Sequence, residues 1–239
     1  AHAFHRNDAL SPDSGTAAAV SGTLARAFIP VWKQAAEYFT GVVVSNFGGT
    51  SFNLNLAAYD TAGTLEPLGQ NPFSTSVGAG LQMSKLGWEF FQGNAYHEDL
   101  SWIELEADNS NRMGSIFLYG VNDTQLLDGA ESQTVYGKRL FFTRPVDEGF
   151  FDGWDPDIHM CIVNPTDEEV TVSCWLKGAT GASRQFHTIP PGGFLAGDAS
   201  ELSASVEEAT NAYMDIEVTE GPGVVGFSRI EFPGVRTAL

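Results

Sequence analysis

The sequence predicts an all-β protein in which an N-terminal arm precedes two tandem β-sandwich domains. Three observations lead to this prediction: an internal repeat, strands with alternating polarity, and little helical periodicity. The 239 residues, 43% of them hydrophobic, are enough for two domains with separate cores. The predicted boundaries are residues 1–26 for the arm, 27–130 for the first domain and 138–239 for the second.

The internal repeat relates residues 42–56 of the first half to residues 160–174 of the second. Each stretch contains an apolar run, a short polar segment and a second run of alternating polarity, a pattern that predicts two strands joined by a turn. Asn46 and Asn164 occupy the same place in the two stretches, directly before the predicted turn. We therefore expect the two halves to align with Asn46 on Asn164.

A second match relates residues 102–107 to residues 213–218, and aligns Glu104 with Asp215. Apolar and acidic side chains alternate there with a period of two, which is typical of a strand with one buried and one solvated face. The polar stretch 123–138 between the halves predicts a linker. Each half then has about 100 residues, the size of an immunoglobulin-like sandwich.

Two short motifs of the second half add a family resemblance. One is Val-Asn-Pro at 163–165 followed by an acidic turn, and the other is Pro-Pro-Gly-Gly at 190–193. With these motifs the second half resembles the immunoglobulin-like repeats of bacterial secreted and surface proteins. The first half departs from the pattern, since Phe47 replaces the proline and residues 77–80 lack the proline pair. The resemblance implies an immunoglobulin-like fold and a secreted or cell-surface location, and it implies no activity.

The charge composition limits the classes of partner. The formal net charge is −18, from 12 basic and 30 acidic residues. Nucleic-acid phosphates are bound by clustered Lys and Arg, so no nucleic-acid partner is expected. An anionic membrane surface would repel the chain, and no apolar run approaches the roughly 20 residues that span a bilayer. We therefore expect no membrane insertion.

The two cysteines lie on the two strands of the predicted second hairpin. If the turn centres on residues 167–168, Cys161 and Cys174 face each other directly. The Cα atoms of opposed partners are about 4.5–5.5 Å apart, which is within disulfide range. An oxidising compartment would then close a disulfide between them. The alternative is a pair of buried thiols that pack as small hydrophobic side chains.

Residues 147–157 form an acidic and aromatic loop that suggests two kinds of ligand. Calcium binds six to eight oxygen atoms supplied by a folded loop, and the candidate ligands are Asp152, Asp155 and Asp157. The alternative is a solvated acidic loop without metal. The candidate glycan contacts are three aromatic residues of the same loop, which alternatively plug the open end of the sandwich: Phe150, Phe151 and Trp154.

No motif in the sequence supports catalysis. His97-Glu98 lacks the second histidine that completes a zinc-protease helix. Glu104 and Glu106 share a strand face about 7 Å apart, a separation found between the carboxylates of inverting glycosidases. A similar acidic pair occurs in both halves, opposite the apolar residues, which favours a solvated strand face. The sequence therefore predicts a protein that is not an enzyme and needs no cofactor, with calcium as the one candidate ion.

The N-terminal arm suggests how the chain associates. Residues 17–28 are rich in alanine and weakly apolar, unlike a typical solvated tail. Such a segment can add as a strand to an open sheet edge of a neighbouring subunit. The alternative is a flexible leader or short linker. The leading hypothesis is a non-enzymatic extracellular structural protein that forms a fibre or surface layer, or an adhesin stalk, and contacts copies of itself or other surface proteins. The alternative is a carbohydrate-binding protein that uses loop 147–157.

Overall fold

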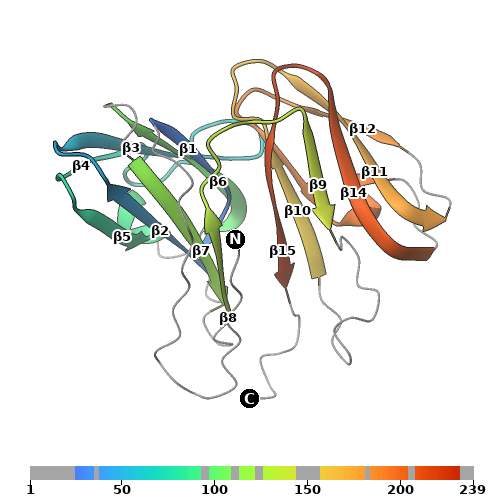
Figure 1. The fold of residues 1–239 in the computed structure, drawn as a ribbon, viewed down its shortest axis with the longest axis horizontal. Coiled ribbons are helices and arrows are strands. Elements are labelled where there is room, and N and C mark those ends of the chain that lie inside the picture. Colours follow the sequence, from blue (N-terminus) through green and yellow to red (C-terminus); the bar gives the residue numbers. More distant parts are fainter. Residues whose placement is uncertain are drawn as a thin grey trace. The chain divides into compact units, whose positions relative to one another are not determined.

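The computed structural model confirms the all-β class. It describes residues 25–34, 38–92, 97–108, 113–121, 126–143, 157–180, 184–203 and 208–231. These residues form antiparallel strands and two short helices, α1 (Gly87–Phe91) and α2 (Ala199–Leu202) (Figure 1). The chain divides into two compact units. Unit 1 contains residues 1–58 and 65–134, and unit 2 contains residues 59–64 and 135–239.

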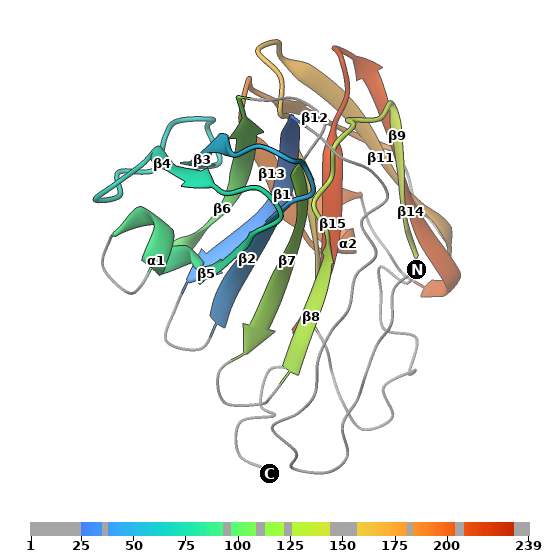
Figure 2. The same cartoon turned by 60° about the vertical axis from the view of Figure 1, so that its left-hand side comes forward.

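Unit 1 contains two four-stranded antiparallel sheets (Figure 2). The first has the order β1 (Arg26–Gln34), β6 (His97–Ala107), β3 (Phe52–Tyr59), β4 (Phe73–Val77). The second has the order β5 (Gln82–Leu86), β2 (Tyr38–Asn46), β7 (Met113–Val121), β8 (Leu126–Glu131). Helix α1 follows β5 and contacts β2 and β5. Strand β8 lies inside the stretch 123–138, where the sequence predicted only a linker. The strand was missed because its alternation of apolar and polar residues is too short and too polar to signal a strand.

Unit 2 contains one sheet of four strands and one of three. The first has the order β12 (Gln185–Ile189), β11 (Val170–Thr180), β14 (Glu208–Glu220), β9 (Arg139–Thr143). The second has the order β13 (Phe194–Gly197), β10 (Asp157–Val163), β15 (Val225–Glu231). Both sheets contribute side chains to one core, in which Met160 and Ile162 of one sheet join Val172, Met214 and Ile216 of the other. The unit is therefore a β-sandwich.

The two units repeat one strand order. Strands β1 to β7 of unit 1 take the same places in their sheets as β9 to β15 of unit 2. In each unit the first strand lies beside the sixth, and the second lies between the fifth and the seventh. In an immunoglobulin constant domain the first strand instead shares its sheet with the second, fourth and fifth. Each unit thus has the two-sheet layout of such domains with a different strand order.

Alternating polarity fixes which side chains of each strand enter the core. On β11 the side chains of Val172, Cys174 and Leu176 are fully buried in the core of unit 2. Burying one such side chain contributes about 1.5–3 kcal/mol to folding. Since successive strand residues point to opposite faces, Ser173 and Trp175 lie on the other face of the sheet. This period of two made the strands predictable from the sequence.

A buried asparagine connects the two sheets of unit 1. Asn46, at the end of β2, donates its side-chain amide to the carbonyls of Thr50 and Val77, each at 2.9 Å. Its side-chain oxygen accepts a hydrogen bond from the Gly48 amide at 2.8 Å. Val77 ends β4, which belongs to the opposite sheet. One side chain therefore fixes the turn after β2 and joins the two sheets.

Asn164 does the same in unit 2. Its amide donates to the carbonyls of Glu168 at 2.7 Å and Pro190 at 2.9 Å, and it also contacts the Ile189 carbonyl at 3.2 Å. Its side-chain oxygen accepts from the Thr166 amide at 3.1 Å. Asn164 therefore ties the end of β10 to the turn before β11 and to the end of β12. The two asparagines that the repeat aligned make equivalent bonds.

The prediction that Cys161 and Cys174 face each other in a hairpin is wrong. Cys161 lies on β10, where its partners are Ala196 and Phe227. Cys174 lies on β11, in the other sheet of the sandwich, and pairs with Ile216. The chain crosses between sheets at the turn, so the two strands that were expected to pair do not.

Both cysteines are buried thiols, and the structure contains no disulfide between them. The alternative interpretation of the sequence, two buried thiols that pack as small side chains, describes them. Burial raises the pKa of the Cys174 thiol to about 12, so it stays protonated at neutral pH. A thiol in this state is a poor nucleophile.

We predict that Asn46→Ala and Asn164→Ala each lower the free energy of unfolding by about 2–4 kcal/mol, because each leaves buried backbone groups without their hydrogen bonds. Urea denaturation of the full chain measures this. The control is Asn55→Ala, whose half-buried side chain accepts one hydrogen bond from Ser74 and which should cost clearly less. Equal losses for the three variants would contradict the role assigned to the two buried amides.

Candidate binding surface

Most site residues predicted from the sequence lie outside the described residues. These are the candidate calcium ligands Asp152 and Asp155, the loop aromatics Phe150, Phe151 and Trp154, and the arm up to residue 24. Asp157 is the first residue of β10 and pairs through its backbone with Glu231. Across the described residues, no three His, Cys, Asp or Glu side chains gather in a way that could hold a metal ion. The calcium and loop hypotheses therefore stay predictions.

The structure draws attention to a different surface, the face of sheet β12-β11-β14-β9 that points away from the core of unit 2 (Figure 1). Phe186 is 60% exposed, Phe141 56% and Tyr213 39%, and Trp175 is half-buried beside them. We call these four residues the aromatic face. Solvent-exposed aromatic side chains grouped in this way are typical of binding surfaces, because a group of exposed apolar rings adds little to the stability of the fold itself.

Strand register sets the spacing of the aromatic face. Phe141 pairs with Asp215, which pairs with Trp175, so the two rings lie two strands apart on one row. With a strand spacing of about 4.8 Å, this separation is about 10 Å. Tyr213 lies beside Phe141, with the ring centroids 6.2 Å apart and tilted by 52°. Phe186 pairs with Ser173 on the edge strand β12.

Three cations lie over these rings. The Lys177 ammonium is 2.9 Å from the centroid of the Trp175 ring, and the Arg184 guanidinium is 5.0 Å from it. The Arg139 guanidinium lies 4.9 Å from the centroid of Phe141. Such contacts are worth about 0.5–1 kcal/mol each at exposed sites. They hold the positive charges in defined positions on the sheet.

Two carboxylates complete the surface, and each is engaged by an arginine. Arg139 donates from Nε and Nη2 to the two oxygens of Asp215, at 2.8 and 2.6 Å. Arg184 approaches Glu217 at 3.4 Å. The hydrogen bond from Arg139 lowers the pKa of the Asp215 carboxyl against the opposing effect of burial, and the same bond raises the pKa of Arg139. Both groups therefore stay charged at neutral pH.

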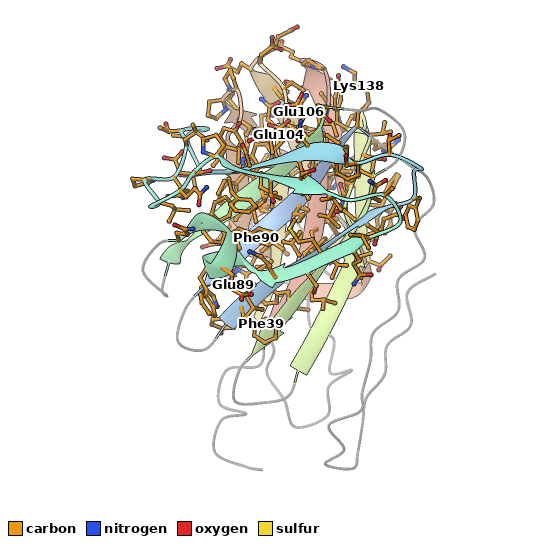
Figure 3. The ribbon with its side chains drawn as sticks, turned by 90° about the vertical axis from the view of Figure 1, so that its left-hand side faces the viewer. Phe39, Glu89, Phe90, Glu104, Glu106 and Lys138 are labelled. Carbon is orange, nitrogen blue, oxygen red and sulfur yellow. The ribbon has the colours of Figure 1, made fainter. Side chains whose placement is uncertain are left out.

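Unit 1 carries the same constellation at the matching positions. Arg26 contacts the carboxylate of Glu104, and its guanidinium lies 5.1 Å from the centroid of Phe28. The rings of Phe28 and Trp102 have centroids 6.2 Å apart and are tilted by 58°. Figure 3 labels Glu104 and Glu106 on β6. Here, however, Phe28 is 2% exposed and Trp102 1%, so the constellation has no solvated rings in unit 1.

The two units differ further along the same face. The place of Trp175 on β11 is taken by Ala57 on β3, and the place of Phe186 on β12 is taken by Ser74 on β4. Unit 2 therefore adds two aromatic residues to a framework that unit 1 builds with small side chains. Strand register, and not the sequence repeat, matches these positions, and the exposure of the rings depends on neighbouring strands that only the fold reveals.

We predict that Asp215→Asn removes a part of the stability that depends on pH. The folded-state pKa of Asp215 lies below its unfolded value of about 3.8. Its stabilising contribution is therefore complete above that value and is lost as the pH falls through the folded-state pKa. Unfolding free energies of wild type and variant should differ at pH 7 and converge at acid pH.

The control is Glu217→Gln, which alters a half-exposed carboxylate held at a longer distance and should have a smaller effect. A difference between wild type and Asp215→Asn that stays constant from neutral to acid pH would contradict the ion-pair account.

Within the described part of the chain, no helix has the length and apolar character needed to cross a membrane. No protein-family model matches the chain. No curated protein matches it either.

Proposed function

We propose that the chain is a non-enzymatic extracellular structural protein, a subunit of a fibre or surface layer or the stalk of an adhesin, in which unit 2 supplies the contact surface. The observation that carries this proposal is the aromatic face with its cations. Aromatic residues and arginine are enriched in the cores of protein interfaces, and Trp, Tyr and Arg are the residues whose loss most often abolishes binding.

The tandem architecture supports a structural role. Two units of one strand order give the chain a repeated scaffold, as in the immunoglobulin-like repeats that the second half resembles in sequence. The units keep the size and two-sheet layout of those repeats with a strand order of their own. Because sandwich folds host many functions, the proposal rests on the surface of unit 2 and not on the fold.

The chemistry of the surface favours binding over catalysis. Asp215 is held by two hydrogen bonds from Arg139, which fixes it as a charged partner and not as a proton donor at neutral pH. The buried Cys174 thiol stays protonated at neutral pH and lies in the core beneath the sheet. Side chains in these states bind and position charge.

A second candidate function is carbohydrate binding through the same face. Phe141 and Phe186 each expose more than half of their surface, and flat apolar rings stack on the apolar faces of sugars. This candidate keeps the carbohydrate hypothesis of the sequence and assigns it to the described sheet in addition to loop 147–157.

We predict that the double variant Trp175→Ala/Phe186→Ser folds normally but no longer attaches to the cell envelope of the organism that makes it. The variant introduces the residues that unit 1 carries at the matching positions, Ala57 and Ser74, so the sandwich tolerates them. Immunogold microscopy and envelope fractionation measure attachment, and the thermal unfolding midpoint measures folding.

The control removes two exposed apolar side chains from unit 1, Phe47→Ser and Leu81→Ser, and should leave attachment unchanged. Equal attachment of wild type and the Trp175/Phe186 variant, or a wild-type protein found only in the cytosol, would contradict the proposal. Release of attached wild type by a soluble polysaccharide would favour the carbohydrate candidate.

A further inference from the structure

We infer that the partner of the aromatic face is a second copy of this chain, which docks with the acidic turn Asp167-Glu168-Glu169 of its unit 2. This inference rests on the proposed function and names the partner of the same surface. It depends on three observations: the charge of the face, the charge of the turn, and the positions at which the two units differ.

The aromatic face is locally positive in a strongly acidic chain. Among the side chains that the structure describes, three of the 12 basic residues, Arg139, Lys177 and Arg184, lie around it, and the carboxylates paired with them are Asp215 and Glu217. The whole chain carries a formal net charge of −18. A second copy is therefore an acidic partner for this face, and charge complementarity of this kind speeds association and selects the partner.

The two arginines of this surface can bind a further anionic group. Arg139 and Arg184 are about half-exposed and use only part of their five donors on Asp215 and Glu217. Stacking on the rings of Phe141 and Trp175 fixes their positions, so less conformational entropy is lost when a carboxylate binds. Lys177 lies on the Trp175 ring, so a sugar could not stack on that side without displacing it. This favours an acidic protein over a neutral sugar.

The acidic turn lies between β10 and β11, and its three carboxylate side chains are exposed. Asn164 holds its backbone from both sides, since it donates to the Glu168 carbonyl and accepts from the Thr166 amide. The exposed Glu220 pairs with Thr171 next to the turn and adds a fourth negative charge to this end of the unit. The backbone of the turn is thus held by hydrogen bonds, and its exposed side chains form a cluster of negative charge.

Unit 1 lacks both features. At the places of Asp167, Glu168 and Glu169 it carries the uncharged Gly49, Thr50 and Ser51, which follow Asn46 as the acidic turn follows Asn164. It also carries Ala57 and Ser74 where unit 2 has Trp175 and Phe186. The acidic turn and the two added aromatic residues therefore occur together in one unit and are absent together from the other.

The contact joins two different surfaces of unit 2. Each copy offers one aromatic face and one acidic turn, so copies can add head to tail. Such an arrangement gives the repeated assembly that a fibre or surface layer needs. The general repulsion between acidic subunits opposes it, so only the local attraction of turn and face holds the copies together.

Charge reversal in both surfaces tests the inference. The face variant is Lys177→Glu/Arg184→Glu and the turn variant is Asp167→Lys/Glu168→Lys. Sedimentation velocity is measured at about 0.15 M salt, which screens the long-range repulsion between copies, up to about 1 mM chain, which detects a dissociation constant as weak as about 1 mM. Wild type should associate, and each variant alone should associate at least about tenfold more weakly, because like charges then meet in the contact.

An equimolar mixture of the two variants should restore association, since each turn then meets a face of opposite charge. The control variant Glu106→Lys changes an exposed charge of unit 1 and should associate as wild type does. A wild type that stays monomeric at every concentration, or a mixture that stays as weak as its components, would overturn the inference. If the Trp175/Phe186 variant nevertheless loses envelope attachment, the proposed function stands with another partner.

Discussion

One buried side-chain amide in each unit determines how the sandwich is assembled. Asn164 joins the end of β10 to the turn that follows and to the end of β12 in the opposite sheet, and Asn46 makes the equivalent connections in unit 1. The chain leaves one sheet at this point and enters the other, so the amide satisfies backbone groups that the change of sheet leaves without strand partners. The connection fixes the backbone of the turn that leads into β11.

The inner and outer faces of the same strands are subject to different constraints. Inward positions such as Val172 and Leu176 are buried in a packed core, where a change of volume is costly. Outward positions lie outside this core, and it is there that unit 2 has Trp175 where unit 1 has Ala57. An ion pair of arginine and a carboxylate is common to both units, so the framework around the varied positions is retained. The difference between the units is therefore a difference of surface on one scaffold.

The sequence was informative where a pattern has a single structural meaning. Period-two alternation identified the strands, and the repeat placed Asn46 on Asn164 and Glu104 on Asp215 before their bonds were known. The sequence pattern gave a wrong pairing for Cys161 and Cys174, because two strands joined by a short turn have the same pattern whether they pair in a hairpin or cross between sheets. It also missed the aromatic face, because the alternation that puts Trp175 outward does not tell whether another element covers it. Exposure of Phe186 and Tyr213 follows only from the assembled sheet.

Hydroxyl-radical footprinting of the full wild-type chain at low and high concentration tests the central claim most directly, because it reads the exposure of each ring in solution. The account predicts that Phe141, Phe186 and Tyr213 are oxidised readily in dilute protein and are protected at high concentration, while the exposed Phe47 of unit 1 is oxidised equally in both. Aromatic-face rings that are already protected in dilute protein, or that are oxidised equally at both concentrations, would contradict it.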